Sequence, residues 1–482
     1  MIHDAMEWAT HEFGGIPRLD KRLQDRLITS AAGIAERPTL SSLPQRFQWN
    51  ELRGIYRLIH RVSGHPELLQ QVHRQRTRER LDACRTVLIL QDDTALTYSD
   101  HLAVADQLGS VNDSATARGF IQHNTIAVDP ERCELLGLIH QHTFCREPKP
   151  EGETRSQRYR RARRESDNWL TPVTSLGRMP DDACWVHIGD RAADFFGLMA
   201  TARSTNSHFL LRLVQERVAS VVVEDSTLDR GEPEWNTYLM EQARQVVATT
   251  TKEVRIGSRG GRPARVATVA LGSVRLKVRR PHGEARWRFE TPMEVTVVRV
   301  WEPDAPAGVE PLEWILGTDF ADQSAEALLK YCSWYEWRWP TMEEYHKVQK
   351  TGLGIEKIRF ETKERLLAAI ALLSVVAVRV LGLRWVLDSH PDDPAKSVAS
   401  AVELSVLEAL ETTTVKRIRT VREFVVAVAR LGGYLGRTND GPPGWGSIWR
   451  GYQRLADLVQ GVELAESIRP PKRPRPKNMG KR

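Results

Sequence analysis

Apolar residues near the start of the chain recur with the spacing of amphipathic helices. From Leu19 to about Val72 the pattern is helical, interrupted by short proline- and serine-rich breaks such as ERPTLSSLPQRF. Helices of this kind bury one face against each other. The pattern predicts a small helical domain, which we place at residues 1–80.

A strand pattern begins at Thr86. TVLILQDD, residues 86–93, is a continuous apolar run that ends in two acids, typical of a strand buried on both faces. FIQHNTIAVD and CELLGLIHQHTF follow as a predicted hairpin, and CWVHIGD and FLLRLV add two strands separated by a helical segment. This order predicts an α/β sheet with acids at strand ends, where such sheets place their functional sites.

Two further changes of pattern divide the rest of the chain. Short alternating strands between about residues 216 and 317 predict an antiparallel β insertion with one basic face, inside a central domain at 81–385. Afterwards the helical period returns. Leu366 to Val378 is too short for the about 20 residues of a membrane span and predicts a buried helix. The remaining pattern predicts a C-terminal helical domain at 386–467.

The composition fits a globular protein. The 482 residues suffice for two or three domains, and 41% hydrophobic with 27% charged residues excludes fibrous and largely disordered classes. Five scattered cysteines without a CxxC pair argue against a disulfide framework and a zinc ribbon, so we expect reduced core residues. The N-terminal sequence lacks the features of a signal peptide, which makes the cytoplasm the expected location.

Positive charge is concentrated in a few segments. The tail at 468–482 holds seven Lys and Arg and no acid, which equals the whole excess of 69 basic over 62 acidic residues. We predict a disordered tail that binds polyanions or keeps the chain soluble. Two internal basic clusters, at 155–164 and 255–265, would form a groove for a phosphate backbone if both flank one site.

Three carboxylates are candidate metal ligands. Asp92 ends the first predicted core strand, Asp190 ends a later one, and Glu343 lies on a downstream helix. Carboxylates from separate elements can converge on hard divalent cations, and a pair of Mg²⁺ ions suits phosphodiester cleavage. An Asp at a strand end is more often a cap, so spacing alone does not single out these three. Their neighbours Asp93 and Glu344 are the nearest alternatives.

The segments around these carboxylates resemble the insertion-sequence four family of bacterial DDE transposases. LQDDTALTYSD resembles the first Asp segment, IGDRAADFF the second, and YEWRWPTMEEYHKVQKTG the Tyr, Arg, Glu, Lys signature. WATHEFGG, RLDKRL, WILGTDF, LLSVVAVRVLGLR and ARLGGYLGR match in the same order. The resemblance therefore runs nearly end to end.

This resemblance implies both a fold and an activity. The fold is a ribonuclease-H-like α/β catalytic domain with an inserted antiparallel β subdomain, between an N-terminal domain that binds DNA ends and a C-terminal dimerisation domain. The activity is cut-and-paste transposition by a homodimer, through nicking, hairpin formation and opening, and joining to target DNA. Asp92, Asp190 and Glu343 match a triad that holds two Mg²⁺ ions, for which Mn²⁺ is expected to substitute.

The resemblance also implies roles for residues that contact DNA. Tyr335, Arg338 and Lys350 match residues that hold the phosphates of the cut end. Trp314 matches a tryptophan that stacks on a flipped base, and Arg212 an arginine near the hairpin. These residue types suit phosphoryl transfer, which depends mainly on positioning and electrostatics.

End recognition is expected from the N-terminal helices. Lys21, Arg22 and Arg26 lie at or near family positions that contact the transposon end. The expected partners are double-stranded DNA, as inverted-repeat ends and as target, and a second copy of the chain. No membrane partner is expected, and the family implies a bacterial, nucleoid-associated protein.

The chain departs from the family pattern at one place. The family has three residues between the signature Arg and Glu, whereas WPTM puts four between Arg338 and Glu343. Counting three reaches Met342, which cannot bind Mg²⁺, so the following EEYHK fixes Glu343 as the ligand. Pro340 suits a first helical turn, and we predict that the helix starts afresh there, with Tyr335 and Arg338 on a separate turn.

Two other functions fit parts of the sequence. One is a catalytically inactive DNA-binding descendant, or an inhibitor of transposition, that keeps the fold. The other is a metal-dependent, structure-selective nuclease. No triad acid is missing, which favours the active transposase over the first, and Trp314 with the Tyr335 cluster favours hairpin chemistry over the second.

Overall fold

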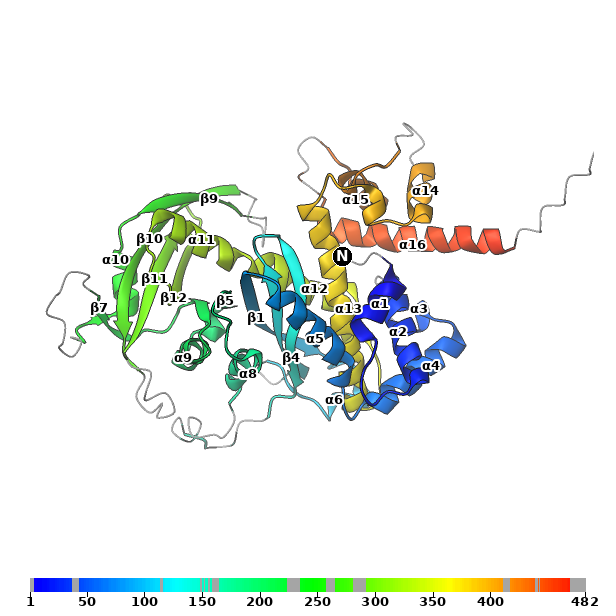
Figure 1. Ribbon diagram of the computed structural model, residues 1–482, viewed down its shortest axis with the longest axis horizontal. Helices are drawn as coiled ribbons and strands as arrows, with labels where there is room; N and C mark the ends of the chain where they lie inside the picture. The colour runs from blue at the N-terminus through cyan, green and yellow to red at the C-terminus, as the bar shows by residue number, and fades with distance from the viewer. Residues whose placement is uncertain are drawn as a thin grey trace, which may run out of the picture.

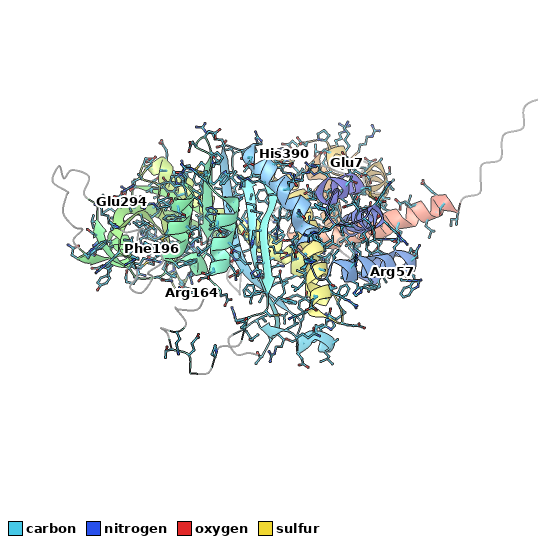
Figure 2. All side chains as sticks on the ribbon, turned by 60° about the horizontal axis from the view of Figure 1, so that its bottom comes forward. Glu7, Arg57, Arg164, Phe196, Glu294 and His390 are labelled. Carbon is cyan, nitrogen blue, oxygen red and sulfur yellow. The ribbon has the colours of Figure 1, made fainter. Side chains whose placement is uncertain are left out.

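The structure is a computed structural model that describes residues 4–36, 43–112, 116–147, 150, 152–154, 157, 164–222, 235–256, 265–280, 292–410, 417–437, 441 and 443–468. Most of both internal basic clusters and the tail after residue 468 lie outside these residues. Helices from the start of the chain lie at one end of the molecule and β strands at the other (Figure 1). Arg57 and Glu294 mark these two ends in Figure 2.

The N-terminal region is helical, as its hydrophobic pattern predicted. Its helices are α1 (Ala5–Phe13), α2 (Lys21–Glu36), α3 (Leu43–Arg46), α4 (Trp49–Val62) and α5 (Leu68–Asp82). The Asp4 side chain caps α1 by accepting a 2.7 Å hydrogen bond from the Glu7 amide. Gln48 and Glu51 form a capping box at the start of α4. Buried side chains such as Leu27 and Ile55 join these helices in one core.

The strands of the described chain form one sheet. The strands are β1 (Thr86–Thr97), β2 (Gly109–Ser110), β3 (Arg118–Asp129), β4 (Glu134–Phe144), β5 (Cys184–Gly189), β6 (His208–Arg212), β7 (Val218–Val221), β8 (Thr237–Tyr238), β9 (Thr250–Ile256), β10 (Arg265–Val278), β11 (Met293–Trp301) and β12 (Glu313–Thr318). Their order is β2-β3-β1-β5-β6-β12-β11-β10-β7-β8, with β4 on β3 and β9 on β10. The mixed α/β class is confirmed.

The first core strand is longer than predicted. β1 continues to Thr97, so Asp92 lies within the strand, paired opposite Asn124 of β3, and does not end it. The strand continues because Ala95 and Thr97 lie in register with β3 and Leu96 is buried. Asp190 does follow its strand directly, and its side chain caps the turn after β5 by accepting from the Ala192 amide at 2.8 Å.

The sheet is parallel at its centre and antiparallel elsewhere. β1 pairs in parallel with β5, and β5 with β6, whereas β3 and β4 form the predicted antiparallel hairpin. β12 pairs with β6, so the antiparallel strands from β7 to β12 extend the same sheet. On β10, the predicted basic strand, Arg275 forms a 2.7 Å ion pair with Glu294 of β11, which neutralises part of its charge.

Helices cover the sheet and form the C-terminal end. They are α6 (Leu102–Ala105), α8 (Asp167–Leu176), α9 (Phe196–Ser204), α10 (Leu239–Gln245), α11 (Ala325–Glu336), α12 (Glu344–Lys347), α13 (Lys363–Ser389), α14 (Ala401–Leu410), α15 (Val421–Leu431) and α16 (Trp445–Ser467). α13 contains the predicted apolar helix and packs between β4 and the N-terminal helices (Figure 1). One stretch of it, Lys363–Val386, is long and apolar enough to cross a membrane, but its most apolar part is mostly buried, as in a core helix.

The five cysteines are free, as predicted. Cys84 and Cys332 are buried, but Cys133 is exposed, so the expectation that all are core residues is wrong. Cys133 is exposed because it lies in the tight turn between β3 and β4, where its φ is 52°.

Candidate active site and nucleic-acid interface

Asp92 of β1 and Arg338 form a largely buried ion pair. Arg338 Nη2 donates to Asp92 Oδ2 at 2.9 Å, and Nη1 lies 3.4 Å from the Tyr335 hydroxyl. Only 9% of the Arg338 side chain and 15% of the Asp92 side chain are exposed. The fold therefore brings together the first predicted metal ligand and two of the predicted phosphate-holding residues.

Asp190 lies within electrostatic reach of this pair. Burial raises the pKa of Asp92 to about 7, Arg338 opposes the shift, and the negative charge of Asp190 adds to it. Two acids crowded in a partly dry site favour a cation between them, because a cation relieves their repulsion. The chemistry of these two side chains thus fits the Mg²⁺ ions that the sequence predicts.

Glu343 is half-buried on the segment that follows Arg338. Among the described residues, no three His, Cys, Asp or Glu side chains lie close enough together to hold one metal ion. Asp92 and Asp190 interact electrostatically. The role of Glu343 as third ligand stays a prediction.

Pro340 lies in the first turn of a new segment after α11, and Tyr335 lies on α11, both as predicted, but the new segment is a π turn and not the start of an α-helix. Residues Trp339–Glu343 form a π turn between α11 and α12, and Arg338 and Glu344 on either side keep right-handed helical dihedrals. A π turn adds one residue to a continuing helix, so it absorbs the extra residue of WPTM without a break. A second π turn, Val348–Gly352, carries Lys350.

An aromatic cluster flanks the ion pair. The Trp314 ring centroid lies 5.2 Å from that of Trp339 and 6.1 Å from that of Tyr335. Burial raises the pKa of Tyr335, and the charges of Arg338 and Arg212 oppose that shift, which places both arginines beside it. Trp314 is 9% exposed, so stacking on a flipped base requires more of its ring to open.

Sequence reasoning missed Trp339. It completes the aromatic cluster, and its Tyr335 contact is edge-on at 5.7 Å. The signal available was its place next to Arg338 inside the signature segment. A tryptophan at that position is equally typical of a core residue, so the sequence alone did not identify Trp339 as part of the site.

A buried polar layer beneath the site was also missed. Asn124, opposite Asp92, donates from Nδ2 to His346 Nε2 at 3.1 Å. Burial lowers the pKa of His346 to about 3, and the positive charges of Lys350 and Arg338 lower it further, so the ring is neutral and accepts this bond. Asp93, the nearest alternative to Asp92 as a metal ligand, instead pairs with His123, whose Nδ1 lies 2.7 Å from Asp93 Oδ1. In the sequence, polar residues on a strand are typical of an exposed face, so the pattern did not predict this buried layer.

The predicted end-binding residues lie together on α2. Lys21, Arg22 and Arg26 line one hollow of about 470 Å³ on the first two turns of the helix. Arg26 lies against α4 at Gly54, where an added Cβ would come within 2.5 Å of the guanidinium. Close approach of a cationic side chain to this helix therefore depends on glycine.

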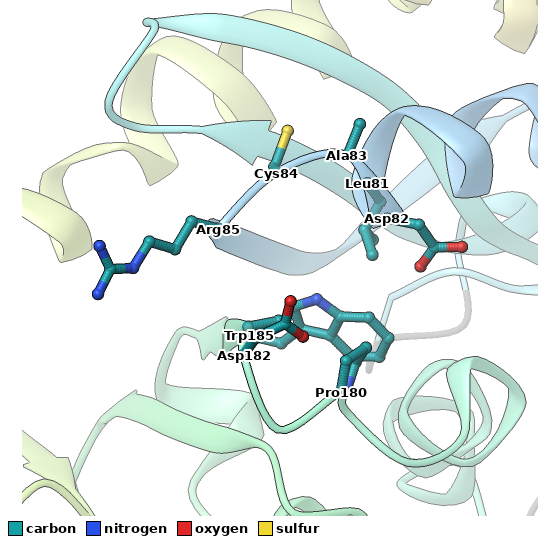
Figure 3. Close-up of a pocket in the computed structure, with 9 residues that line it drawn as sticks. Leu81, Asp82, Ala83, Cys84, Arg85, Pro180, Asp182 and Trp185 are labelled. Atoms are coloured by element: carbon teal, nitrogen blue, oxygen red, sulfur yellow. The ribbon is translucent and has the colours of Figure 1, made fainter.

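A separate pocket of about 320 Å³ lies where β1 and β5 begin (Figure 3). Arg85 and Cys84 form one wall, and Pro180, Asp182 and Trp185 form the other. None of the predicted site residues lines it. It lies at the other end of the strands from Asp92 and Asp190 and carries no part of the predicted chemistry.

Two segments match known protein families. Residues 5–63 match a family described as transposase DNA-binding, and residues 375–470 match a family described as the transposase Tn5 dimerisation domain. The matches support DNA binding and homodimer formation, and they define a transposase. These two matches confirm the resemblance to Tn5-like transposases of the insertion-sequence four family that the sequence showed.

Proposed function

We propose that this transposase is catalytically active and moves its element by cut-and-paste, two-metal phosphoryl transfer. The observation that carries the proposal is the buried Asp92–Arg338 pair with Asp190 in electrostatic reach. A carboxylate whose pKa is raised by burial and a second acid is a mark of a functional site. The flanking Tyr335 hydroxyl supports phosphate positioning.

The sheet supports a ribonuclease-H-like catalytic core. Its first half runs β4-β3-β1-β5-β6, an antiparallel hairpin beside parallel strands. Asp92 and Asp190 lie on the adjacent strands β1 and β5 or directly after them, as convergent ligands require. The domain limits of 1–80, 81–385 and 386–467 are part of the proposal.

Asp92, Asp190 and Glu343 would hold two Mg²⁺ ions, which supply an activated attacking oxygen and stabilise the leaving oxygen. Arg338 and Tyr335 then hold the phosphates of the cut end, and Lys350 adds positive charge from the next turns. Arg212 and Trp314 act at the hairpin stage. Placing these groups before the reaction lowers the barrier, since phosphoryl transfer needs little covalent help from the protein.

The N-terminal helices would bind the inverted-repeat end through the hollow of Lys21, Arg22 and Arg26. Phosphate contacts from such residues fix the register of a protein on DNA. Pairing of two chains through the region 375–470 would bring two ends together before they join target DNA. We place this activity in the bacterial cytoplasm, at the nucleoid.

A second candidate is a DNA-binding descendant without catalysis. The ion pair itself favours it, because Arg338 occupies an oxygen of Asp92 that a metal ion would need. One experiment decides between the active transposase and the inactive descendant. Linear DNA that carries the inverted repeats flanking the gene is incubated with the protein and Mg²⁺, and the products are run on denaturing gels. Hairpin-ended products that vanish in Asp92→Ala and Glu343→Ala support the active transposase. Binding without cleavage supports the descendant, and nicking without hairpins the structure-selective nuclease.

A further inference from the structure

The π turn before Glu343 is bonded from outside its own helix. Trp385 of α13 donates from Nε1 to the Pro340 carbonyl oxygen at 3.2 Å. Its ring packs on Trp337, with centroids 4.9 Å apart and planes 34° apart, and the side chain is 6% exposed. The next residue back, Arg384, pairs with Glu344. Adjacent residues of α13 thus bond to the turn itself and to the residue directly after it.

Such outside support answers a physical need of the turn. The hydrogen-bond ladder switches from i→i+4 to i→i+5 and back within a few residues, which opens backbone carbonyls to other donors. Pro340 adds to this, since it has no N–H with which to continue the ladder. Without a fixed partner, the extra residue could move along the helix, and the side chains that it passes, Glu343 among them, would change direction.

The position of Glu343 follows directly from the position of this turn. Arg338 precedes the turn and is anchored to Asp92, whereas Glu343 is its last residue. One residue of shift rotates a helical side chain by about a quarter turn, enough to direct a carboxylate away from a metal site. The turn therefore sets the angle between the anchored arginine and the predicted ligand.

We propose that Trp385 is a positioning residue that fixes the π turn and so sets the direction of the Glu343 side chain. This inference rests on the proposed function for its effect on cleavage. Trp385 lies in the segment that matches the dimerisation family, so one region serves both chain pairing and the shape of the active-site helix.

The test replaces Trp385 with Phe, which keeps an aromatic ring on Trp337 but removes the N–H donor together with one fused ring. Hydrogen–deuterium exchange over residues 337–344 is expected to rise at least fivefold. The cleavage rate is expected to fall about tenfold, while affinity for the end DNA stays within twofold. Trp334→Phe is the matched control, because Trp334 packs on Phe320 and Tyr331 and has no bond to the turn.

Exchange and cleavage separate the possible failures. Unchanged exchange in Trp385→Phe, or an equal rise in Trp334→Phe, overturns the role of Trp385 whatever the enzyme does. If exchange rises in Trp385→Phe but the wild-type protein itself does not cleave end DNA, the structural role is supported and the proposed function is refuted. Deleting Pro340 removes the extra residue of the turn. In that deletion variant, exchange over residues 337–344 is expected not to change on Trp385→Phe. If it rises as much as in the full-length chain, the proposal is also overturned.

Discussion

Arg338 binds Asp92 across a sequence separation of 246 residues, and both side chains are buried at the bond. Burial of a carboxylate is unfavourable unless an opposite charge compensates it. Arg338 provides that charge to Asp92, whose pKa is raised to about 7. The ion pair is therefore both part of the proposed active site and a determinant of stability.

Removing the arginine charge should destabilise the protein more at high pH. In Arg338→Met we expect the free energy of unfolding to fall by about 3 kcal/mol at pH 8, because without Arg338 the Asp92 carboxyl must either stay ionised and unpaired or take up a proton. The loss should be smaller at pH 5, below the Asp92 pKa of about 7, because the protonated acid needs no counter-charge. Urea unfolding at the two pH values measures this difference.

Arg57→Met supplies the control for that experiment. Arg57 is exposed on α4, so its replacement should change stability by less than about 0.5 kcal/mol at both pH values. An equal loss at pH 5 and pH 8 in Arg338→Met would mean that packing of the long side chain, and not its charge, provides the stabilisation.

Thr341 in the π turn should be replaceable by valine with a gain in stability. Its hydroxyl is buried without a hydrogen-bond partner, and the side chain is fully buried. An unsatisfied buried hydroxyl costs about 1–3 kcal/mol, whereas a methyl group of the same shape costs nothing there. Thermal unfolding of Thr341→Val should therefore show a higher Tm.

Thr318→Val should have the opposite effect. Thr318 is as deeply buried, but its hydroxyl donates to the Phe209 carbonyl at 2.7 Å. Its loss leaves that carbonyl unpaired and should lower stability by about 1–3 kcal/mol. If both variants move Tm in the same direction, the difference in hydrogen bonding does not decide the outcome at these sites.

The strand that carries Asp92 could be recognised from its sequence, but its end could not. TVLILQDD has the continuous apolar pattern of a buried strand, and the two acids look like a terminus. The strand continues because its partner β3 supplies backbone hydrogen bonds through Thr97, a tertiary contact that local pattern does not contain. The mixed α/β class, which depends on many such segments together, was predictable.

The π turn was beyond prediction for a similar reason. WPTM identifies an extra residue, and proline at the start of a helix is the commoner solution. The alternative is stabilised by Trp385, more than forty residues away, whose partner carbonyl no local rule identifies. The polar layer of Asn124 and His346 likewise depends on two elements meeting, so neither residue signals it alone.

Glu12 should make stability depend on acidity well below neutral pH. Burial raises its pKa, but His73, at 2.5 Å, and Arg80 outweigh this and hold it at about 2. A depressed carboxyl pKa gives stability that is present above the unfolded value of about 4.5 and lost as pH falls towards 2. The loss is on the order of 3 kcal/mol.

Glu12→Gln removes this dependence and tests it. The variant should be less stable than wild type at pH 6, and the difference should shrink steadily between pH 4.5 and pH 2. Glu7→Gln, on the exposed side of the same helix, should track wild type throughout. A constant difference between Glu12→Gln and wild type over this range would show that geometry, not ionisation, governs the site.

Gly54→Ala should weaken end binding without weakening the fold. An added Cβ would come within 2.5 Å of the Arg26 guanidinium, the flexible end of a side chain that can move away. Alanine also favours the interior of α4 by up to about 1 kcal/mol over glycine, so Tm should stay level or rise. The displaced arginine no longer lies where it would meet a phosphate.

This displacement should be visible in the salt dependence of binding. If Arg26 neutralises one phosphate, Gly54→Ala should reduce the slope of log K against log salt by about 1, as Arg26→Ala should. Gly64→Ala, where an added Cβ meets no atom within 4 Å, should leave both affinity and slope unchanged. An unchanged slope in Gly54→Ala and in Arg26→Ala would remove Arg26 from the DNA interface. A reduced slope in both would identify the α2–α4 junction as a surface that positions phosphate-binding charge.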